Sequence, residues 1–294
     1  MSPNSPAVQA HSSAKQHAAK VTDPEAARVR SVTKATAKQQ LLKQLICSDA
    51  PEQALRYRGF RMIAGVDEVG RGALFGPVVA AAVILPKAVR ALASAGLKDS
   101  KQLSRADRER LDKRVRRAAI AVAVAEVDAA MIDTVNIYQA TRRAMHQAVD
   151  ALSVRPDHLL IDAMRLDHPC AQTRLFYGDA LSLSIAAASV VAKVYRDARM
   201  RELDEIHPQY GFASHKGYAT PEHRRALTLH GPTPLHRQSF APVALAGRAA
   251  LVVQASSLEE LHLVARDEEE LAPLDLLFEQ TDLECGTDQE EEWA

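Results

Sequence analysis

Two apolar, strand-like segments joined by a turn constrain the fold of this chain more strongly than any other feature of its sequence. The first segment runs from Met62 to Val69, and the second, from Val78 to Leu85, is rich in β-branched and small apolar residues. The eight residues between them include three glycines and Pro77, which are typical of turns. The pattern predicts a hairpin of two buried strands.

The rest of the pattern extends this hairpin into a layered α/β structure. Residues 119–127 and 158–161 are short apolar runs that predict two more strands. Helical spacing of apolar residues predicts helices over 104–117, 136–152 and 182–206, the first with Ser104 as its N-cap. Strands at the start, followed by helices that alternate with strands, indicate a sheet that opens with a meander and is covered by helices.

Charge is distributed unevenly, although the 294-residue chain is neutral overall. The first 58 residues carry a net charge of +5, residues 59–246 carry +7 and the last 48 residues carry −12. We therefore expect a basic, mostly disordered arm over residues 1–57, a folded domain over 58–246 and an acidic, mostly disordered tail over 247–294. A basic central domain suits a polyanionic partner such as nucleic acid, because neutralised phosphates release counterions.

Two further features bear on the cellular compartment. The longest apolar run, Val78 to Leu85, is far shorter than the roughly 18 residues of a membrane helix, and the N-terminus lacks a compact apolar signal region. Cys47, Cys170 and Cys285 are far apart and form no CxxC pair, which argues against a zinc knuckle or a disulfide framework. We expect a cytoplasmic protein without a membrane segment.

Four carboxylates stand where the predicted strands end or where a helix begins. Asp67 and Glu68 close the first strand, Asp162 follows the strand at 158–161, and Asp179 precedes the long helix. Adjacent carboxylates that leave a buried strand are costly without a partner, and a divalent cation takes several hard oxygens at once. Singly, each acid is as readily a solvated strand end or a helix cap. Together they could hold two magnesium ions for phosphodiester hydrolysis.

Glycines and cations near these acids suggest phosphate and sugar contacts. Gly70, Arg71 and Gly72 form a turn whose open backbone can approach a phosphate or a ribose hydroxyl. A second cluster comprises Lys98, Lys101, Lys193, Arg196, His215, Lys216 and Tyr218. Its cations can bind flanking phosphates, while the tyrosine can stack on a sugar or a base. Singly, such residues are more often surface charges or packed aromatics, so the cluster has meaning only if the fold assembles it.

Eight ordered motifs between residues 61 and 243 point to one family. They are GVDEVGRG at 65–72, GPVVAAAVIL at 76–85, LKDSKQLS at 97–104, LLIDA at 159–163, GD at 178–179, IAAASVVAKVYRD at 185–197, PQYGFASHKGY at 208–218 and HGPTPLHRQSFAPV at 230–243. In these motifs the chain resembles bacterial ribonuclease HII. The resemblance implies an α/β fold with an RNase H-like mixed sheet flanked by helices, a helical C-terminal part and disordered terminal extensions, and it makes residues 58–246 the catalytic domain.

The resemblance also implies a role for each candidate residue. The catalytic acids fall on Asp67, Glu68, Asp162 and Asp179, and the first three are the expected ligands of Mn²⁺ or Mg²⁺. The residues expected to recognise the junction between RNA and DNA are Gly70, Arg71 and Gly72. Tyr218 is expected to stack on a sugar, and Lys101 and Lys193 are expected to contact phosphates. The implied enzyme is a metal-dependent endoribonuclease that hydrolyses the RNA strand of RNA–DNA hybrids. It also cuts 5′ of single ribonucleotides in duplex DNA, by two-metal-ion catalysis that leaves 3′-hydroxyl and 5′-phosphate ends.

The sequence differs from the family's usual motifs at a few positions, and three other protein classes are alternatives. Ala73 follows the GRG turn where a proline is frequent, and Ala163-Met164 stand where Gly-Asn is frequent, which affects loop conformation more than catalysis. The sister family, ribonuclease HIII, usually carries a folded N-terminal binding domain and lacks the GRG turn. A binding protein that has lost catalysis would lack an acid, and a two-metal nuclease for DNA junctions would need no ribose sensor.

The acidic tail contains a short apolar cluster from Leu274 to Phe278. It resembles the peptides by which replication and repair proteins hold a sliding clamp, although a stray apolar patch is the more frequent origin of so short a motif. A sliding clamp is therefore a candidate partner beside the substrate duplexes, and we expect the chain to act as a monomer.

Overall fold

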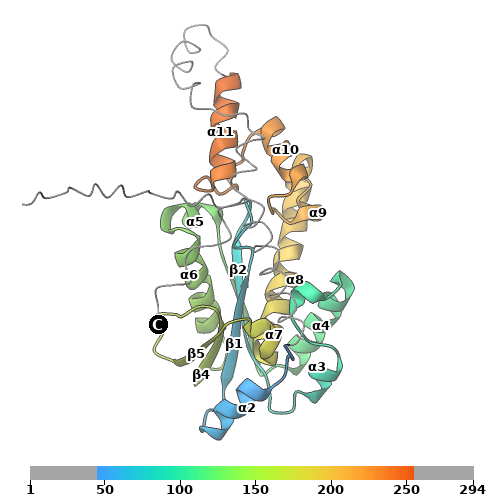
Figure 1. Ribbon diagram of the computed structural model, residues 1–294, viewed down its shortest axis with the longest axis vertical. Coiled ribbons are helices and arrows are strands. Elements are labelled where there is room, and N and C mark those ends of the chain that lie inside the picture. The colour runs from blue at the N-terminus through green and yellow to red at the C-terminus, as the bar shows by residue number, and fades with distance from the viewer. Residues whose placement is uncertain (1–44, 255–294) are drawn as a thin grey trace, which may run out of the picture. The chain divides into compact units, whose positions relative to one another are not determined.

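A computed structural model describes residues 45–254 and shows a five-stranded mixed sheet in the order β3-β2-β1-β4-β5 (Figure 1). The strands are β1 (Ile63–Val69), β2 (Val78–Ile84), β3 (Ala121–Val127), β4 (His158–Asp162) and β5 (Ala171–Leu175). The first three are antiparallel neighbours, whereas β4 runs parallel to β1 and β5 parallel to β4. The predicted hairpin and the predicted strands are confirmed. Strand β5 had not been predicted, because its half-exposed AQTRL sequence has no apolar pattern.

The helices follow the predicted order, with several short ones added. They are α2 (Ala50–Tyr57), α3 (Arg90–Ser94), α4 (Arg105–Ala118), α5 (Ala129–Val135), α6 (Ile137–Asp150), α7 (Gly178–Leu181), α8 (Leu183–Ile206), α9 (Phe212–His215), α10 (Pro221–His230) and α11 (Ala241–Gln254), with 3-10 turns η1 (Ser100–Gln102) and η2 (Pro208–Tyr210). Ser104 caps α4 by accepting a hydrogen bond from the amide of Asp107, as predicted. None of the helices within residues 45–254 is long and apolar enough to cross a membrane.

Helices cover both faces of the sheet (Figure 1). Apolar residues of α6 pack with one face of β1 and β2, while those of α8 and α4 pack with the other. Helix α8 lies very close to β1 at Gly65, where an added Cβ would lie 2.1 Å from the carbonyl carbon of Ser184. Only glycine fits this position, which lies two residues before Asp67.

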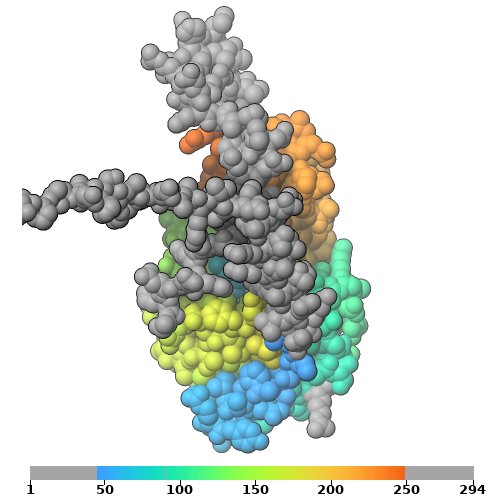
Figure 2. Space-filling model, in the orientation of Figure 1, coloured from blue at the N-terminus to red at the C-terminus, as the bar shows by residue number. Residues whose placement is uncertain are grey.

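The segment before the sheet packs onto it through α2. Leu55 belongs to a small buried cluster with Ile63, Leu160 and Ile185, and Figure 2 shows the blue α2 beside the yellow-green β4–β5 segment. The carboxylate of Glu52 is buried and accepts hydrogen bonds from the Ser182 hydroxyl (2.6 Å) and the Ser184 amide (2.8 Å). Residues 46–57 therefore hold the N-terminus of α8 in place. The division of the chain at residue 57 stays a prediction.

The C-terminal part is helical, as expected, and has a core of its own. Phe75, Met200 and Phe212 pack there with residues of α10 and α11. Helix α11 continues through Gln254, eight residues beyond the end predicted for the folded domain, because residues 247–254 contain alanine and leucine and carry only one charge. The predicted clamp segment, Leu274 to Phe278, lies outside the described residues.

Candidate active site

Adjacent parallel strands bring two of the predicted acids to the same level of the sheet. Val66 of β1 pairs with Ile161 of β4, and this is the last pair between the two strands, so the next residues, Asp67 and Asp162, lie at the level of the sheet where β1 and β4 separate. Asp67 is buried, and its Oδ1 accepts a hydrogen bond from the amide of Glu68 (2.8 Å). Oδ1 of Asp162 accepts a hydrogen bond from the backbone amide of Gly178 (2.7 Å), and this contact connects the end of β4 to α7.

The pKa values of all four acids are raised, because nearby cations do not balance their burial and mutual repulsion. Burial raises the pKa of Asp67 well above its usual range, and the negative charges of Glu68, Asp162 and Asp179 raise it further. Burial also raises the pKa values of Glu68 and Asp162. The pKa of Asp179 rises to about 6, because burial and nearby carboxylates outweigh the ammonium of Lys101, which lies 3.4 Å from Asp179 Oδ2. Additional positive charge at this site would therefore lower these pKa values and stabilise the ionised acids.

The donor set suits a divalent cation. Carboxylate oxygens are the ligands that Mg²⁺ and Mn²⁺ prefer, and the buried Oε2 of Glu68 has no hydrogen-bond partner. Between residues 45 and 254, no three His, Cys, Asp or Glu side chains already form a closed metal cage. The acids thus supply the right chemistry, and their side chains must rotate to converge on an ion.

Backbone strain flanks two of the acids. Ala163, directly after Asp162, has φ +48°, and Tyr177, two residues before Asp179, has φ +57°. Both values lie in the left-handed region that favours glycine. The amide of Ala163 donates to the carbonyl of Leu175 (2.9 Å). Ala163 therefore keeps the backbone conformation that would suit the glycine expected at this position from the sequence resemblance, and an alanine adopts it at an energetic cost.

The GRG turn is held from its carbonyl side by a buried arginine. The guanidinium of Arg237 donates to the carbonyl oxygens of Gly70 and Arg71, each at 2.7 Å. Gly70 has φ +91°, and a Cβ there would lie 2.2 Å from Nε of Arg196. A Cβ at Gly72 would meet nothing within 4 Å, so this position faces open space. The turn is therefore fixed on one side and accessible on the other.

The cation–tyrosine cluster is assembled beside this turn. Ala73 forms an antiparallel bridge with Tyr218, and the amide of Leu74 donates to the carbonyl of Gly217 (2.8 Å). Lys193 Nζ lies 5.9 Å from the centroid of the Tyr218 ring and 2.8 Å from Oδ1 of Asp197. The structure thus places Tyr218 and Lys193 next to the turn, while Lys101 lies at the acids.

The sequence interpretation of Arg196 as a phosphate-binding residue is wrong. Its side chain is fully buried and donates to the carbonyl oxygens of Pro77 (3.0 Å), Phe75 (3.2 Å) and Lys216 (2.9 Å). Spacing along a helix shows which residues share a side but not how deeply each one lies. Arg196 is part of the scaffold behind the turn and has no free surface for a phosphate.

Sequence reasoning also missed residues that support the acids. Ser189 of α8 hydrogen-bonds to the Asp67 carboxylate, and its hydroxyl lies 2.8 Å from that of Ser100. The only sequence signal for Ser189 is that it is the one polar residue in the apolar run IAAASVVA at 185–192, which forms the buried part of α8. Arg237 had no such signal, because its acceptors lie more than 160 residues away along the chain.

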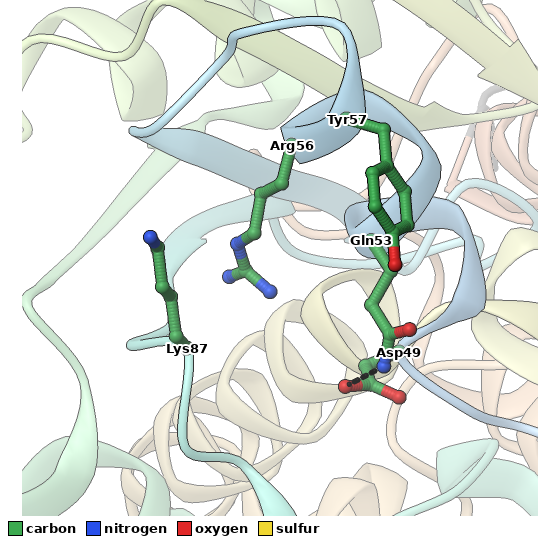
Figure 3. A pocket seen from close by; sticks show the side chains of 5 residues that line it. All are labelled: Asp49, Gln53, Arg56, Tyr57 and Lys87. Atoms are coloured by element: carbon green, nitrogen blue, oxygen red, sulfur yellow. Dashed lines mark hydrogen bonds between the residues drawn. The ribbon is translucent and has the colours of Figure 1, made fainter.

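A hollow of about 300 Å³ lies away from these acids (Figure 3). Its lining residues are Asp49, Gln53, Arg56, Tyr57 and Lys87. In Figure 3 the side chains of Lys87 and Arg56 lie on one side of the view, and those of Tyr57, Gln53 and Asp49 lie on the other. Helix α2, which supplies most of this lining, packs at the start of β1, whereas the acids lie near its end. The hollow is therefore not the catalytic site.

Sequence comparisons agree on one family. The family model described as Ribonuclease HII matches residues 64–243. Ribonuclease HII of Koribacter versatilis is 55% identical over 225 residues, which cover 76% of this chain and 87% of that protein. Ribonuclease HII of Geobacillus kaustophilus is 57% identical over 192 residues, which cover 65% of this chain and 73% of that protein.

Solved structures share the fold. The ribonuclease H2 of Pyrococcus horikoshii has a TM-score of 0.57 at 24% identity, covering 63% of this chain and 96% of that one. The RNase HII of Archaeoglobus fulgidus, solved in a complex with PCNA, has a TM-score of 0.50 at 27% identity, covering 57% and 87%. The RNase H-like fold is thereby confirmed. With the acids, the glycine turn and the matched family model in agreement, this chain belongs to the ribonuclease HII family and is a hydrolytic nuclease with ribonuclease H activity.

Proposed function

We propose that this enzyme hydrolyses the RNA strand of RNA–DNA hybrids and cuts on the 5′ side of single ribonucleotides in duplex DNA. The products would carry 3′-hydroxyl and 5′-phosphate ends. One observation carries this proposal: four buried or half-buried acids lie beside a glycine turn that is anchored by Arg237 and bridged to Tyr218. The acids suit phosphodiester hydrolysis, and the accessible side of the turn suits contact with a ribose 2′-hydroxyl.

Asp67, Glu68 and Asp162 would hold Mn²⁺ or Mg²⁺, with Asp179 beside them. Two bound divalent ions supply charge stabilisation to the attacking and leaving oxygens of a phosphodiester. The ion pair between Arg71 and Glu68, 3.4 Å long, links the turn to one acid. A ribose that engages the turn would therefore be sensed next to the acids.

The remaining side chains would orient the strand. Tyr218 would stack on the sugar beside the cut, while the ammonium groups of Lys101 and Lys193 would bind flanking phosphates. Lys101 and Lys193 already pair with Asp179 and Asp197, so phosphate binding would replace or share these contacts. The presence of all four acids disfavours a binding protein without catalysis, and the turn disfavours a nuclease specific for DNA alone.

Asp67→Asn and Asp162→Asn test the assignment on a duplex with one embedded ribonucleotide. Each should lower the cleavage rate by roughly a thousandfold or more and weaken Mn²⁺ binding measured by calorimetry, because an amide is a poor ligand for a hard cation. Asp150→Asn is the matched control, since Asp150 pairs with His146 on the surface of α6. Near-normal cleavage by either active-site variant would rule out the assigned roles. An all-DNA duplex of the same sequence should remain uncut.

A clamp interaction is a second proposal, favoured by the PCNA complex of the Archaeoglobus fulgidus protein. We propose that Leu274 to Phe278 bind a sliding clamp while the enzyme acts as a cytoplasmic monomer. Leu277→Ala combined with Phe278→Ala in the full chain should abolish clamp binding in surface plasmon resonance and leave cleavage of short duplexes unchanged. Clamp affinity equal to that of the unmodified chain would exclude this segment.

A further inference from the structure

Two buried histidines connect the segment 231–240 to the backbone of Tyr218. His223 on α10 and His236 are both fully buried, and their Nε2 atoms are 3.2 Å apart. Nδ1 of His223 lies 2.9 Å from the carbonyl oxygen of Tyr218. Nδ1 of His236 lies 2.9 Å from the backbone nitrogen of Thr233. The two rings therefore form a continuous line of contacts that ends on the backbone of the proposed stacking residue.

The partners at both ends fix the protonation of this line. The amide of Thr233 can only donate, so Nδ1 of His236 accepts and its proton resides on Nε2. The carbonyl of Tyr218 can only accept, so Nδ1 of His223 donates and its Nε2 is an acceptor. His236 Nε2–H can then donate to His223 Nε2, which satisfies every nitrogen. Burial lowers the pKa of His223 to about 4 and that of His236 to about 3, so both rings are neutral at neutral pH.

The residue that follows His236 holds the GRG turn, which together with Tyr218 forms the proposed ribose sensor. Arg237 donates to the carbonyls of Gly70 and Arg71, and its backbone amide donates to the carbonyl of Leu74 (2.9 Å). Neighbouring residues of one segment thus reach the GRG turn directly and Tyr218 through His223.

We propose that His236 and Arg237 are paired positioning residues that fix the GRG turn and Tyr218 relative to each other, with His223 as the link to Tyr218. Their spacing sets how well the enzyme recognises the step from a ribose to a deoxyribose. This inference rests on the proposed function, because it assumes that the turn and Tyr218 contact the sugars on either side of that step.

Replacing His223 tests the link without altering a residue that contacts substrate. In His223→Asn, the amide nitrogen can occupy the place of Nδ1 and still donate to the Tyr218 carbonyl. In His223→Gln, the amide reaches toward His236, and the Tyr218 carbonyl loses its donor. Each variant keeps only one of the two contacts of His223, so on the one-ribonucleotide duplex both should lose roughly 10- to 100-fold in kcat/KM. Unchanged kcat/KM in a folded His223→Asn chain would show that the contact with His236 is not needed, and unchanged kcat/KM in a folded His223→Gln chain would show that the contact with Tyr218 is not needed; either result would overturn the proposal.

A double-mutant cycle separates positioning from general destabilisation. If His223 acts through Tyr218, adding His223→Gln to Tyr218→Ala should cause no further loss of kcat/KM beyond that of Tyr218→Ala. Multiplicative losses would contradict the inference while leaving the role of Tyr218 intact. An unchanged kcat/KM in Tyr218→Ala alone would instead contradict the proposed function, and the inference with it.

His158→Asn is the matched control for losing a buried histidine. His158 is also buried, at the start of β4, and its Nε2 lies 2.9 Å from the Thr173 hydroxyl. Its substitution should lower the denaturant midpoint to a similar extent and leave kcat/KM unchanged for the folded enzyme. A loss of kcat/KM in His158→Asn as large as that in His223→Gln would show that any buried histidine has this effect, and would overturn the proposal.

Discussion

Arg196→Met separates the structural role of Arg196 from the phosphate-binding role suggested by the sequence. The guanidinium makes three hydrogen bonds to carbonyl oxygens at 2.9 to 3.2 Å. Methionine fills a similar volume but donates to none of them, so three carbonyls lose a charged donor. Each buried polar group left without a partner costs about 1–3 kcal/mol. Because the three acceptors share one side chain, we expect a total loss of about 3–5 kcal/mol in the free energy of unfolding.

This loss is a large fraction of the 5–15 kcal/mol that is typical of a folded domain. Urea unfolding followed by circular dichroism should show a lower midpoint with an unchanged slope. Below the transition, the variant's affinity for duplex should fall with salt as steeply as that of the unmodified enzyme, because no phosphate contact is removed.

Lys193→Met provides the comparison, since Lys193 is the neighbouring cation that we assign to a phosphate. Because Lys193 pairs with the mostly buried Asp197, its loss should lower the free energy of unfolding by about 1–3 kcal/mol and reduce the salt dependence of binding by about one phosphate contact. The reasoning about Arg196 is refuted if Arg196→Met is stable to within about 1 kcal/mol and instead reduces the salt dependence.

Three further predictions concern stability, and urea unfolding measures each. Ala163→Gly should raise the free energy of unfolding by about 1 kcal/mol, because glycine adopts a φ of +48° without strain; destabilisation would contradict this. Glu52→Gln should lower it by about 1–3 kcal/mol, because the Ser182 hydroxyl and the Ser184 amide lose a charged acceptor; an unchanged midpoint would contradict this. Because folding depresses the pKa values of His223 and His236, their stabilisation is complete above pH 6.5 and falls as the pH approaches 4. The loss at pH 5 should be on the order of 2 kcal/mol per histidine, and a His223→Asn chain with the same pH dependence would refute it.

The sequence predicted the parts of the site that depend on local pattern. Asp67 and Asp162 each end an apolar run, and strands that lie in one sheet bring such ends together, so their proximity could be expected from two short segments. The cap of α4 at Ser104 was predictable for the same reason, because its acceptor and donor are three residues apart.

The scaffold behind the site could not be predicted in this way. Arg196 and Arg237 bind carbonyls as far as 121 and 167 residues away, and nothing in a linear pattern distinguishes a buried arginine with several acceptors from an exposed one. Strand β5 was missed because an edge strand with one solvated side needs few apolar residues. The pairing of His223 with His236 depends on helix α10 and the segment 231–240 meeting in space, which spacing along the chain does not encode.

The contact between Glu52 and the start of α8 also has a consequence for the order of events during synthesis. The carboxylate and the Ser182 hydroxyl are 130 residues apart, and a ribosome adds roughly 5–20 residues per second. Glu52 therefore emerges many seconds before its partner and must remain solvated while β1, β2 and β4 are made. Because the same contact adjoins α7, the segment with Asp179 can be anchored only once α8 has emerged. The nascent chain should consequently stay inactive at least until α8 has emerged, when about two-thirds of the chain has been made.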